Sequence, residues 1–263
     1  MEQMTQKWIE TDDGRITVDV YGAPDAAAMI IIPGVMADSA AWATVAQRVT
    51  SAKTVAVVNR RGRDPSSAMT DDYSLDTEVR DARAVLNAFS DVQTLFGWSY
   101  GGLISLHLAN AVAIDHVIAY EPIMAPFGAD ELEGLRAAHE AADWDRSLEI
   151  VLGEVTSMSD SAIEALRSNA AVWAGMRQLS RPVYDETRAI NESLSPREFA
   201  TEAARIDLVI GEKNRGQAPY GRTFDDVLGL TPRAVVHQLS GQGHLAHLEA
   251  PEQLAGMIDD LCA

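Results

Sequence analysis

A serine lies in a glycine-rich turn with the sequence Gly-Trp-Ser-Tyr-Gly, centred on Ser99. The run 94–97 before it has the composition of a strand, and the stretch 100–110 after it has the pattern of a helix. A serine between a strand and a helix, with a glycine two residues away on each side, occupies a sharp turn that exposes its hydroxyl. The free N–H groups at the start of the helix favour developing negative charge nearby. The pattern predicts that Ser99 attacks a carbonyl carbon.

Serine needs a base to remove its proton, and His244 is the best placed of the six histidines. It lies on a loop between an expected strand at 234–238 and an expected helix at 246–261. From such a loop a histidine reaches over the carboxyl edge of a parallel sheet towards a serine that follows another strand. His247 stays open as a rival base. A metal site formed by His244, His247 and Glu249 is a weaker alternative, because no further cluster of ligands accompanies it.

Two other interpretations of the glycine-rich turn fail on residue type. A dinucleotide-binding loop needs a glycine where Ser99 stands. A nucleotide-phosphate loop needs Gly-Lys-Ser or Gly-Lys-Thr, which occurs nowhere in the chain. The sequence therefore predicts chemistry without a cofactor and without a metal ion.

The elements that must position these residues alternate along most of the chain. Continuous short apolar runs indicate parallel strands buried on both faces. Expected strands cover 15–21 (in an early antiparallel hairpin), 28–32, 54–58, 94–97, 117–120, 208–211 and 234–238, and expected helices cover 39–50, 75–89, 100–110 and 246–261. This order predicts an α/β fold in which a mostly parallel, doubly wound sheet carries helices on both faces.

Residues 126–199 depart from this alternation, because they show helical periodicity and no strand-like run. We interpret them as a helical lid, or cap, inserted into a core domain formed by 1–125 and 200–263. Trp144 and Trp173 within the insertion are candidates for the wall of a substrate site, although aromatic residues at helical spacing often belong to a core.

Composition restricts the class of partner. The chain has 263 residues with 47% hydrophobic residues, and 21 Lys and Arg against 39 Asp and Glu give a net charge of −18. Such a surface repels nucleic acids and anionic membranes. Cys262 is the only cysteine, so no intrachain disulfide forms. The first ten residues lack the pattern of a secretory signal, and no apolar run is long enough to cross a bilayer. We expect a cytoplasmic protein.

Several motifs in this order resemble the α/β-hydrolase family over nearly the whole chain. Residues 30–35 resemble the family's strand and oxyanion loop, with Pro33 in place of the usual histidine. Residues 59–66 resemble its Arg-Gly-x-Gly-x-Ser turn, with Asp64 where the second glycine usually falls. Residues 244–251 resemble its closing Gly-His…Glu-x-Pro-Glu segment. The resemblance implies the α/β-hydrolase fold and a serine–acid–histidine triad.

An oxyanion hole needs two backbone donors. One is expected to be the N–H of Tyr100, the residue after the nucleophile. The other is expected to be the N–H of Val35, on the loop after the strand that ends at residue 32. Together they would bind the anion that forms when Ser99 attacks.

The acid of the triad is not where the family usually keeps it. The loop after the strand 208–211 has Asn214 at the position where an aspartate is expected. An amide accepts and donates hydrogen bonds, but it does not stabilise a positively charged imidazole by charge. Glu121, at the end of the neighbouring strand 117–120, is therefore the predicted acid, and the chain order serine, glutamate, histidine is kept.

Alternatives to this assignment stay open. Glu212, Asp225 or Asp226 could supply the acid instead, and Glu121 could pair with an arginine such as Arg61. If Glu121 is the acid, Asn214 is available to line the substrate pocket, together with Trp98 beside the nucleophile.

The sequence predicts a cofactor-independent serine hydrolase, an esterase or lactonase, that cleaves a carboxylic ester, lactone or thioester of a small apolar molecule through an acyl-enzyme. Two alternatives stay open: a non-hydrolytic enzyme of the same fold (a lyase, acyl transferase, cyclase or perhydrolase) and a catalytically inactive ligand-binding receptor. An epoxide hydrolase or dehalogenase would need an aspartate in place of Ser99. The expected partner is a small-molecule substrate, with neither nucleic acid nor membrane, and a homodimer is left open.

Overall fold

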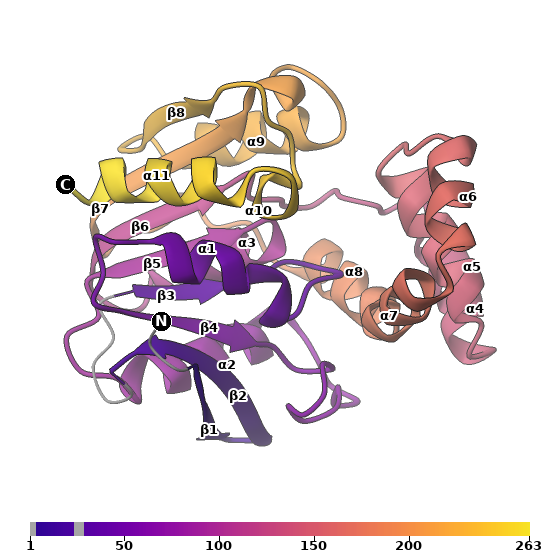
Figure 1. Cartoon of the computed structure of the whole chain (residues 1–263), viewed down its shortest axis with the longest axis horizontal. Coiled ribbons are helices and arrows are strands. Elements are labelled where there is room, and N and C mark those ends of the chain that lie inside the picture. Colours follow the sequence, from indigo (N-terminus) through magenta and orange to yellow (C-terminus); the bar gives the residue numbers. More distant parts are fainter. Residues whose placement is uncertain (1–3, 24–28) are drawn as a thin grey trace.

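The computed structural model describes residues 4–23 and 29–263 and contains an eight-stranded sheet in the order β1-β2-β4-β3-β5-β6-β7-β8 (Figure 1). Strands β3 to β8 run parallel to one another. Strand β2 pairs antiparallel with β4, and β1 pairs antiparallel with β2. The bounds are β1 Thr5–Thr11, β2 Gly14–Gly22, β3 Met29–Ile32, β4 Thr54–Asn59, β5 Thr94–Trp98, β6 Ile114–Tyr120, β7 Ala203–Gly211 and β8 Val235–Leu239. The predicted sheet is confirmed. Ala28, expected to begin β3, and residues 1–3 of the N-terminal segment lie outside the described residues.

Alternate residues of the central strands enter apolar clusters on opposite faces of the sheet. In β3, Ile30 and Ile32 belong to the cluster with α2, α3 and α9, whereas Met29 and Ile31 belong to the cluster with α1 and α11. Both faces are therefore covered, which explains why the strand is apolar at every position. The bounds are α1 Ala43–Arg48, α2 Leu75–Asn87, α3 Tyr100–Leu108, α9 Tyr220–Gly229 and α11 Pro251–Cys262.

Two predicted helices are divided in the structure. The helix expected at 246–261 ends after α10 (Ala246–Glu249), and α11 begins at Pro251. Proline has no N–H to continue a helix, but its fixed φ suits the first helical position. The helix expected at 39–50 consists of the 3₁₀ turn Ala40–Trp42 followed by α1. Helix α9 was not predicted, and the glycines at 221 and 229 weaken its helical pattern.

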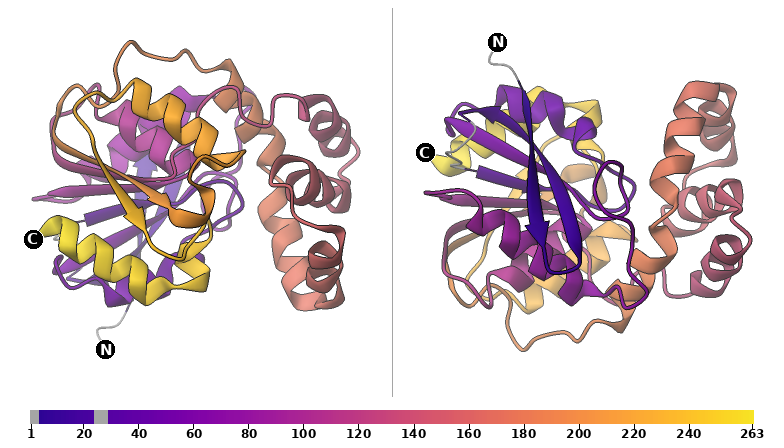
Figure 2. Two further views of the ribbon diagram at one scale, coloured as in Figure 1. Left: turned by 90° about the horizontal axis from the view of Figure 1, so that it is seen from above. Right: turned by 90° about the horizontal axis from the view of Figure 1, so that it is seen from below.

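The segment 126–199 contains five α-helices and no strand among its described residues, so its predicted helical content is confirmed. The bounds are α4 Leu132–Glu140, α5 Trp144–Glu149, α6 Asp160–Ser168, α7 Ala170–Ser180 and α8 Val183–Glu192, with a π-helical turn at Ile150–Val155. Helices α4 to α7 stand apart from the sheet, at the edge where the parallel strands end, and α8 leads back to it (Figures 1 and 2). We call the segment 126–199 the cap.

The cap has apolar packing of its own. One cluster contains Leu135, Ile150, Val151 and Val183, and the other contains Leu148, Leu152, Ile163 and Trp173. Within the described ranges, no helix combines the length and apolar character that a bilayer span requires.

Candidate active site

Ser99 occupies the turn between β5 and α3 with φ of 56° and ψ of −120°. This is a conformation that non-glycine residues rarely adopt, and it is held by a hydrogen bond from the Ser99 N–H to the Tyr120 carbonyl at 3.0 Å. Packing requires the two glycines of the motif. A Cβ on Gly97 would collide with the carbonyl of Gly101, and a Cβ on Gly101 would collide with that of Ile32. The turn therefore has the geometry expected of a nucleophile elbow.

His244 and Glu121 meet at the carboxyl edge of the sheet. Glu121 follows β6 with φ of 42° and is fully buried, and its Oε2 lies 2.7 Å from the Nδ1 of His244. Because an ionised carboxylate only accepts hydrogen bonds, Nδ1 carries the proton and Nε2 keeps a lone pair. In the described part of the chain, no hydrogen bond joins Nε2 to the Ser99 hydroxyl.

The side chain of Asn214 lies on the carboxylate of Glu121. Its Nδ2 donates to Oε1 at 3.0 Å and to Oε2 at 2.8 Å, and the Gly211 N–H donates to Oε1 at 2.9 Å. The residue at the family's usual acid position thus holds the glutamate of the neighbouring strand. An aspartate there would instead oppose Glu121 with a like charge.

The open alternatives for the acid have other partners. Glu212 accepts a hydrogen bond from the Gly241 N–H at 2.6 Å. Arg61, considered as a partner of Glu121, makes two 3.0 Å hydrogen bonds with the carboxylate of Asp81. Of the carboxylates weighed, the structure brings Glu121 to His244.

The loop that carries His244 is fixed by three aromatic side chains. Trp98 donates from Nε1 to the His244 carbonyl at 2.8 Å, and the Tyr120 hydroxyl donates to the Gly243 carbonyl at 2.5 Å. The ring of Tyr220 stacks on the imidazole with centroids 3.6 Å apart. Burial, followed by the charge of Glu121, raises the pKa of Tyr220, so its phenol stays neutral beside the imidazole. Trp98, predicted to bind substrate, therefore contacts the histidine, with the centroids of the two rings 4.7 Å apart. Tyr220 was missed because no motif marks it.

His247 is buried and stacks on Trp42 with centroids 4.7 Å apart and rings almost parallel. Burial, with a smaller contribution from neighbouring His244, lowers the pKa of His247 to about 3. A ring with this pKa is a weak base at neutral pH, which favours His244 for proton transfer. Within the described residues, no three His, Cys, Asp or Glu side chains are grouped as metal ligands, those of His244, His247 and Glu249 included.

The low pKa of His247 predicts a pH dependence of stability. The unfolded chain takes up this proton below its ordinary pKa of about 6.5, whereas the folded chain does not until about pH 3. Over this range the free energy of unfolding falls by about 1.4 kcal/mol per pH unit as the pH is lowered. His247→Phe keeps a ring on Trp42 and removes the titration. Urea unfolding at pH 7.5 and 5.0 should show the wild type losing about 2 kcal/mol more than the variant. Equal losses would contradict the burial of an uncharged His247.

The loop after β3 runs against the nucleophile. A Cβ on Gly34 would lie 2.7 Å from the Cβ of Ser99, so only glycine permits this approach. The N–H of Val35 donates to no acceptor in the described part of the chain. Tyr100 is the first residue of α3, so its N–H has no acceptor within the helix. Both N–H groups remain candidates for the oxyanion hole.

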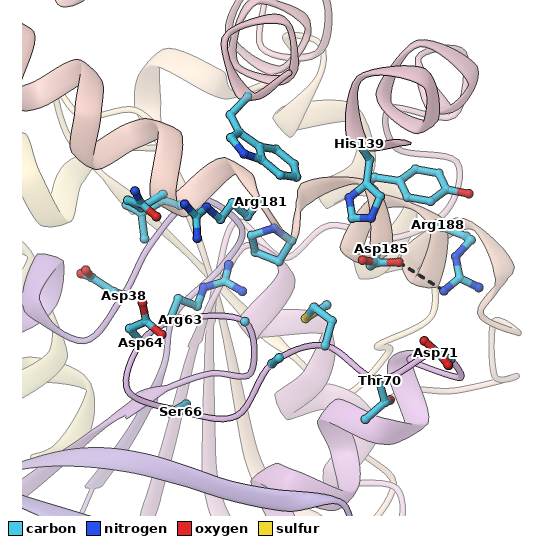
Figure 3. Close-up of a pocket in the computed structure, with 18 of the residues that line it drawn as sticks. Asp38, Arg63, Asp64, Ser66, Thr70, Asp71, His139, Arg181, Asp185 and Arg188 are labelled. Atoms are coloured by element: carbon cyan, nitrogen blue, oxygen red, sulfur yellow. Dashed lines mark ion pairs between the residues drawn. The ribbon is translucent and has the colours of Figure 1, made fainter. Parts of the chain in front are cut away.

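A cavity of about 960 Å³ lies between the cap and the core. Figure 3 shows Asp38 and Arg63 at one end and His139 and Asp185 at the other. Trp144, predicted to contact substrate, lines this cavity. Trp173 does not line the cavity. Its ring is buried in the apolar cluster of the cap and its Nε1 donates to Asp145 at 2.6 Å, so its placement gives no support to substrate contact.

Comparison with solved structures shows the same fold. An alpha/beta hydrolase from Sphaerobacter thermophilus is 20% identical, with a TM-score of 0.77 over 98% of this chain and 100% of that chain. A carboxylesterase from Bacillus subtilis is 18% identical, with a TM-score of 0.65 over 97% of this chain and 90% of that chain. An enol-lactonase from Burkholderia xenovorans is 14% identical, with a TM-score of 0.69 over 97% of this chain and 98% of that chain.

The sequence itself matches the Alpha/beta hydrolase family over residues 29–257. No curated protein matches it. The matched region begins with β3 and ends within α11, so it contains the nucleophile turn, the cap and the histidine loop. The chain therefore belongs to the alpha/beta hydrolase family.

Proposed function

We propose that the protein is a serine hydrolase that cleaves a carboxylic ester, lactone or thioester of a small, largely apolar molecule through an acyl-enzyme on Ser99. The observation that carries this proposal is the 2.7 Å hydrogen bond from His244 Nδ1 to the buried Glu121. This bond keeps the proton on Nδ1, so Nε2 is unprotonated and can act as the base that a serine nucleophile needs. Membership of the family and the esterase and lactonase activities named for two structural neighbours also support it.

The first half of the proposed reaction forms the acyl-enzyme. His244 Nε2 takes the proton of the Ser99 hydroxyl while the oxygen attacks the carbonyl carbon. The N–H groups of Val35 and Tyr100 bind the resulting oxyanion, and losing one such donor typically raises the barrier by about 3–4 kcal/mol. The imidazolium then gives its proton to the leaving oxygen or sulfur as that bond breaks. Glu121 stabilises the imidazolium by its charge.

The second half releases the acid. Water loses a proton to His244 Nε2 as its oxygen attacks the acyl carbon, and the proton returns to Ser99 as the ester bond breaks. No cofactor enters either half. The cavity between the cap and the core is lined by none of Ser99, Glu121 and His244, so the proposal is supported by the contacts of these three residues and not by that cavity.

Fluorophosphonate labelling of the wild type tests the proposal directly. The folded protein should gain the mass of one phosphonyl group, on the peptide that contains Ser99, and lose hydrolysis of p-nitrophenyl butyrate in parallel. Urea-unfolded protein is the control and should remain unlabelled, because an unactivated serine reacts slowly. A folded wild type that stays unlabelled and hydrolyses no ester would contradict the proposal and favour the ligand-binding receptor.

A further inference from the structure

Two buried arginines hold the backbone of the oxyanion loop, which we define as residues 33–37. Arg60, on the turn after β4, donates from Nε to the Pro33 carbonyl and from Nη2 to the Gly34 carbonyl, both at 2.8 Å. Arg63 donates from Nε to the Ala37 carbonyl at 3.0 Å. The guanidiniums thus contact the loop at both ends.

The hydrogen bond to Gly34 sets the direction of the Val35 N–H. The Gly34 carbonyl and the Val35 N–H belong to one peptide unit, and in a planar trans peptide these groups point in opposite directions. The carbonyl faces Arg60, so the N–H faces away from it. Gly34 also lies against Ser99, so this peptide unit is beside the nucleophile and its N–H is on the side away from Arg60.

The common counter-ion of both arginines comes from the cap. Glu186, on α8, is fully buried. Its Oε1 lies 2.5 Å from Arg60 Nη2 and 2.7 Å from Arg63 Nη1, and its Oε2 accepts from Arg63 Nη2 at 3.0 Å. Burial alone would lower the pKa of Arg60, but the carboxylates of Glu186 and Glu78 raise it, so the guanidinium stays charged.

The side chains of the same loop also pack on the cap. Val35 and Met36 contact the cap cluster that contains Leu135 and Ile150, and Met36 also contacts the cluster that contains Trp173. Met36 has φ of 60°, so the loop turns sharply just after the proposed donor. The cap therefore supports the loop by an ionic contact and by an apolar one.

We infer that Glu186 is a positioning residue for this reaction: through Arg60 and Arg63 it holds the oxyanion loop so that the Val35 N–H is presented to the reacting carbonyl. The inference rests on the proposed function. Glu186 touches no reacting atom in this arrangement. The position of α8 governs how well the transition state is stabilised, so loss of the Glu186 contact lowers kcat more than it raises KM.

Glu186→Gln keeps the shape of the side chain, removes its charge and turns an amide N–H₂ towards a guanidinium. Glu192→Gln is the matched control, because Glu192 lies on the same helix, is largely exposed and pairs with Arg188 at 3.3 Å. With p-nitrophenyl acetate, and with fluorophosphonate titration counting competent sites, kcat per titrated site should fall at least about tenfold in Glu186→Gln. Its KM should change less than about threefold, and the control should behave as the wild type.

The affinity of the variant for phenylboronic acid is a second readout, and general destabilisation of the fold does not change it. The boronate forms a tetrahedral anion on serine, so its affinity should weaken in Glu186→Gln in step with kcat/KM. A variant with fewer titratable sites but unchanged kcat per site and unchanged boronate affinity would overturn the inference. Arg60→Lys keeps the charge but loses the planar fork that joins the Pro33 and Gly34 carbonyls to Glu186, and it should show the same pattern if Glu186→Gln folds poorly. A wild type without labelling or turnover would contradict the proposed function instead.

Discussion

Replacing Ser99 with alanine is expected to lower turnover of an activated ester by roughly 10⁴- to 10⁶-fold. The alanine variant cannot form an acyl-enzyme, so only binding and the two backbone donors remain to accelerate attack by water. Steady-state hydrolysis of p-nitrophenyl butyrate, with intact mass after fluorophosphonate treatment, measures the loss. Ligand binding should survive, because the change removes one oxygen atom and keeps the Cβ and the backbone hydrogen bond of the turn.

Ser105→Ala is the matched control for this result. Ser105 is a buried serine on α3, the helix that follows the nucleophile turn, and its hydroxyl donates to the Gly101 carbonyl at 2.8 Å. It should retain turnover within about tenfold, since a neutral hydrogen bond contributes roughly 1 kcal/mol. Turnover retained by Ser99→Ala would exclude Ser99 as the nucleophile, and an equal loss in both variants would indicate damage to the turn.

Glu121→Gln is expected to lower turnover by roughly 10²- to 10⁴-fold while the protein stays folded. Glutamine has nearly the same shape, but it is neutral and no longer stabilises the imidazolium by charge. The Asn214 amide and the His244 Nδ1–H both donate to the carboxylate of Glu121, so the amide N–H₂ of a glutamine at this position would face another donor. The comparable Asp-to-Asn change in a serine protease lowers turnover by roughly 10⁴-fold. Single-turnover and steady-state ester hydrolysis, with near-ultraviolet circular dichroism as the folding check, measure the effect.

Two neighbouring variants make this test specific. Asn214→Ala removes one donor to Glu121 but leaves the Gly211 N–H and His244 in place, so it should reduce turnover much less than Glu121→Gln. Glu212→Gln changes an exposed carboxylate on the same loop and should behave as the wild type. A larger loss in Asn214→Ala than in Glu121→Gln would return the orienting role to the family's usual position.

The parts of the site that were predicted are those encoded by short stretches of sequence. The turn around Ser99 and the loop around His244 each combine glycines with a neighbouring strand and helix, so local pattern was enough to find them. Glu121 followed from topology, because β6 and β7 are neighbours and their ends meet. The contact of Asn214 with Glu121 was not foreseen, because it depends on the direction of one side chain rather than on spacing.

The parts that were missed depend on contacts between distant segments. Tyr220 reaches the imidazole from α9, a ten-residue helix that was not predicted and that contains glycines near both ends. Glu186 is more than a hundred residues from Arg60 and Arg63. Its spacing from Val183 and Ile190 places it on the buried face of α8, but spacing alone does not show which side chains it meets there. Such positions are identified only when the tertiary packing is known.

Three residues at this site, Met36, Ser99 and Glu121, hold left-handed backbone conformations although none is a glycine. Each such conformation costs roughly 1–3 kcal/mol relative to relaxed backbone. These conformations lower the free energy of unfolding, but they hold the residues of the site in place. Glycine at any of the three would relieve the backbone strain and would remove a side chain that the site uses. Directed evolution that selects for heat resistance alone would therefore favour glycine at these three positions. A library screened for survival at high temperature must consequently be screened for turnover as well.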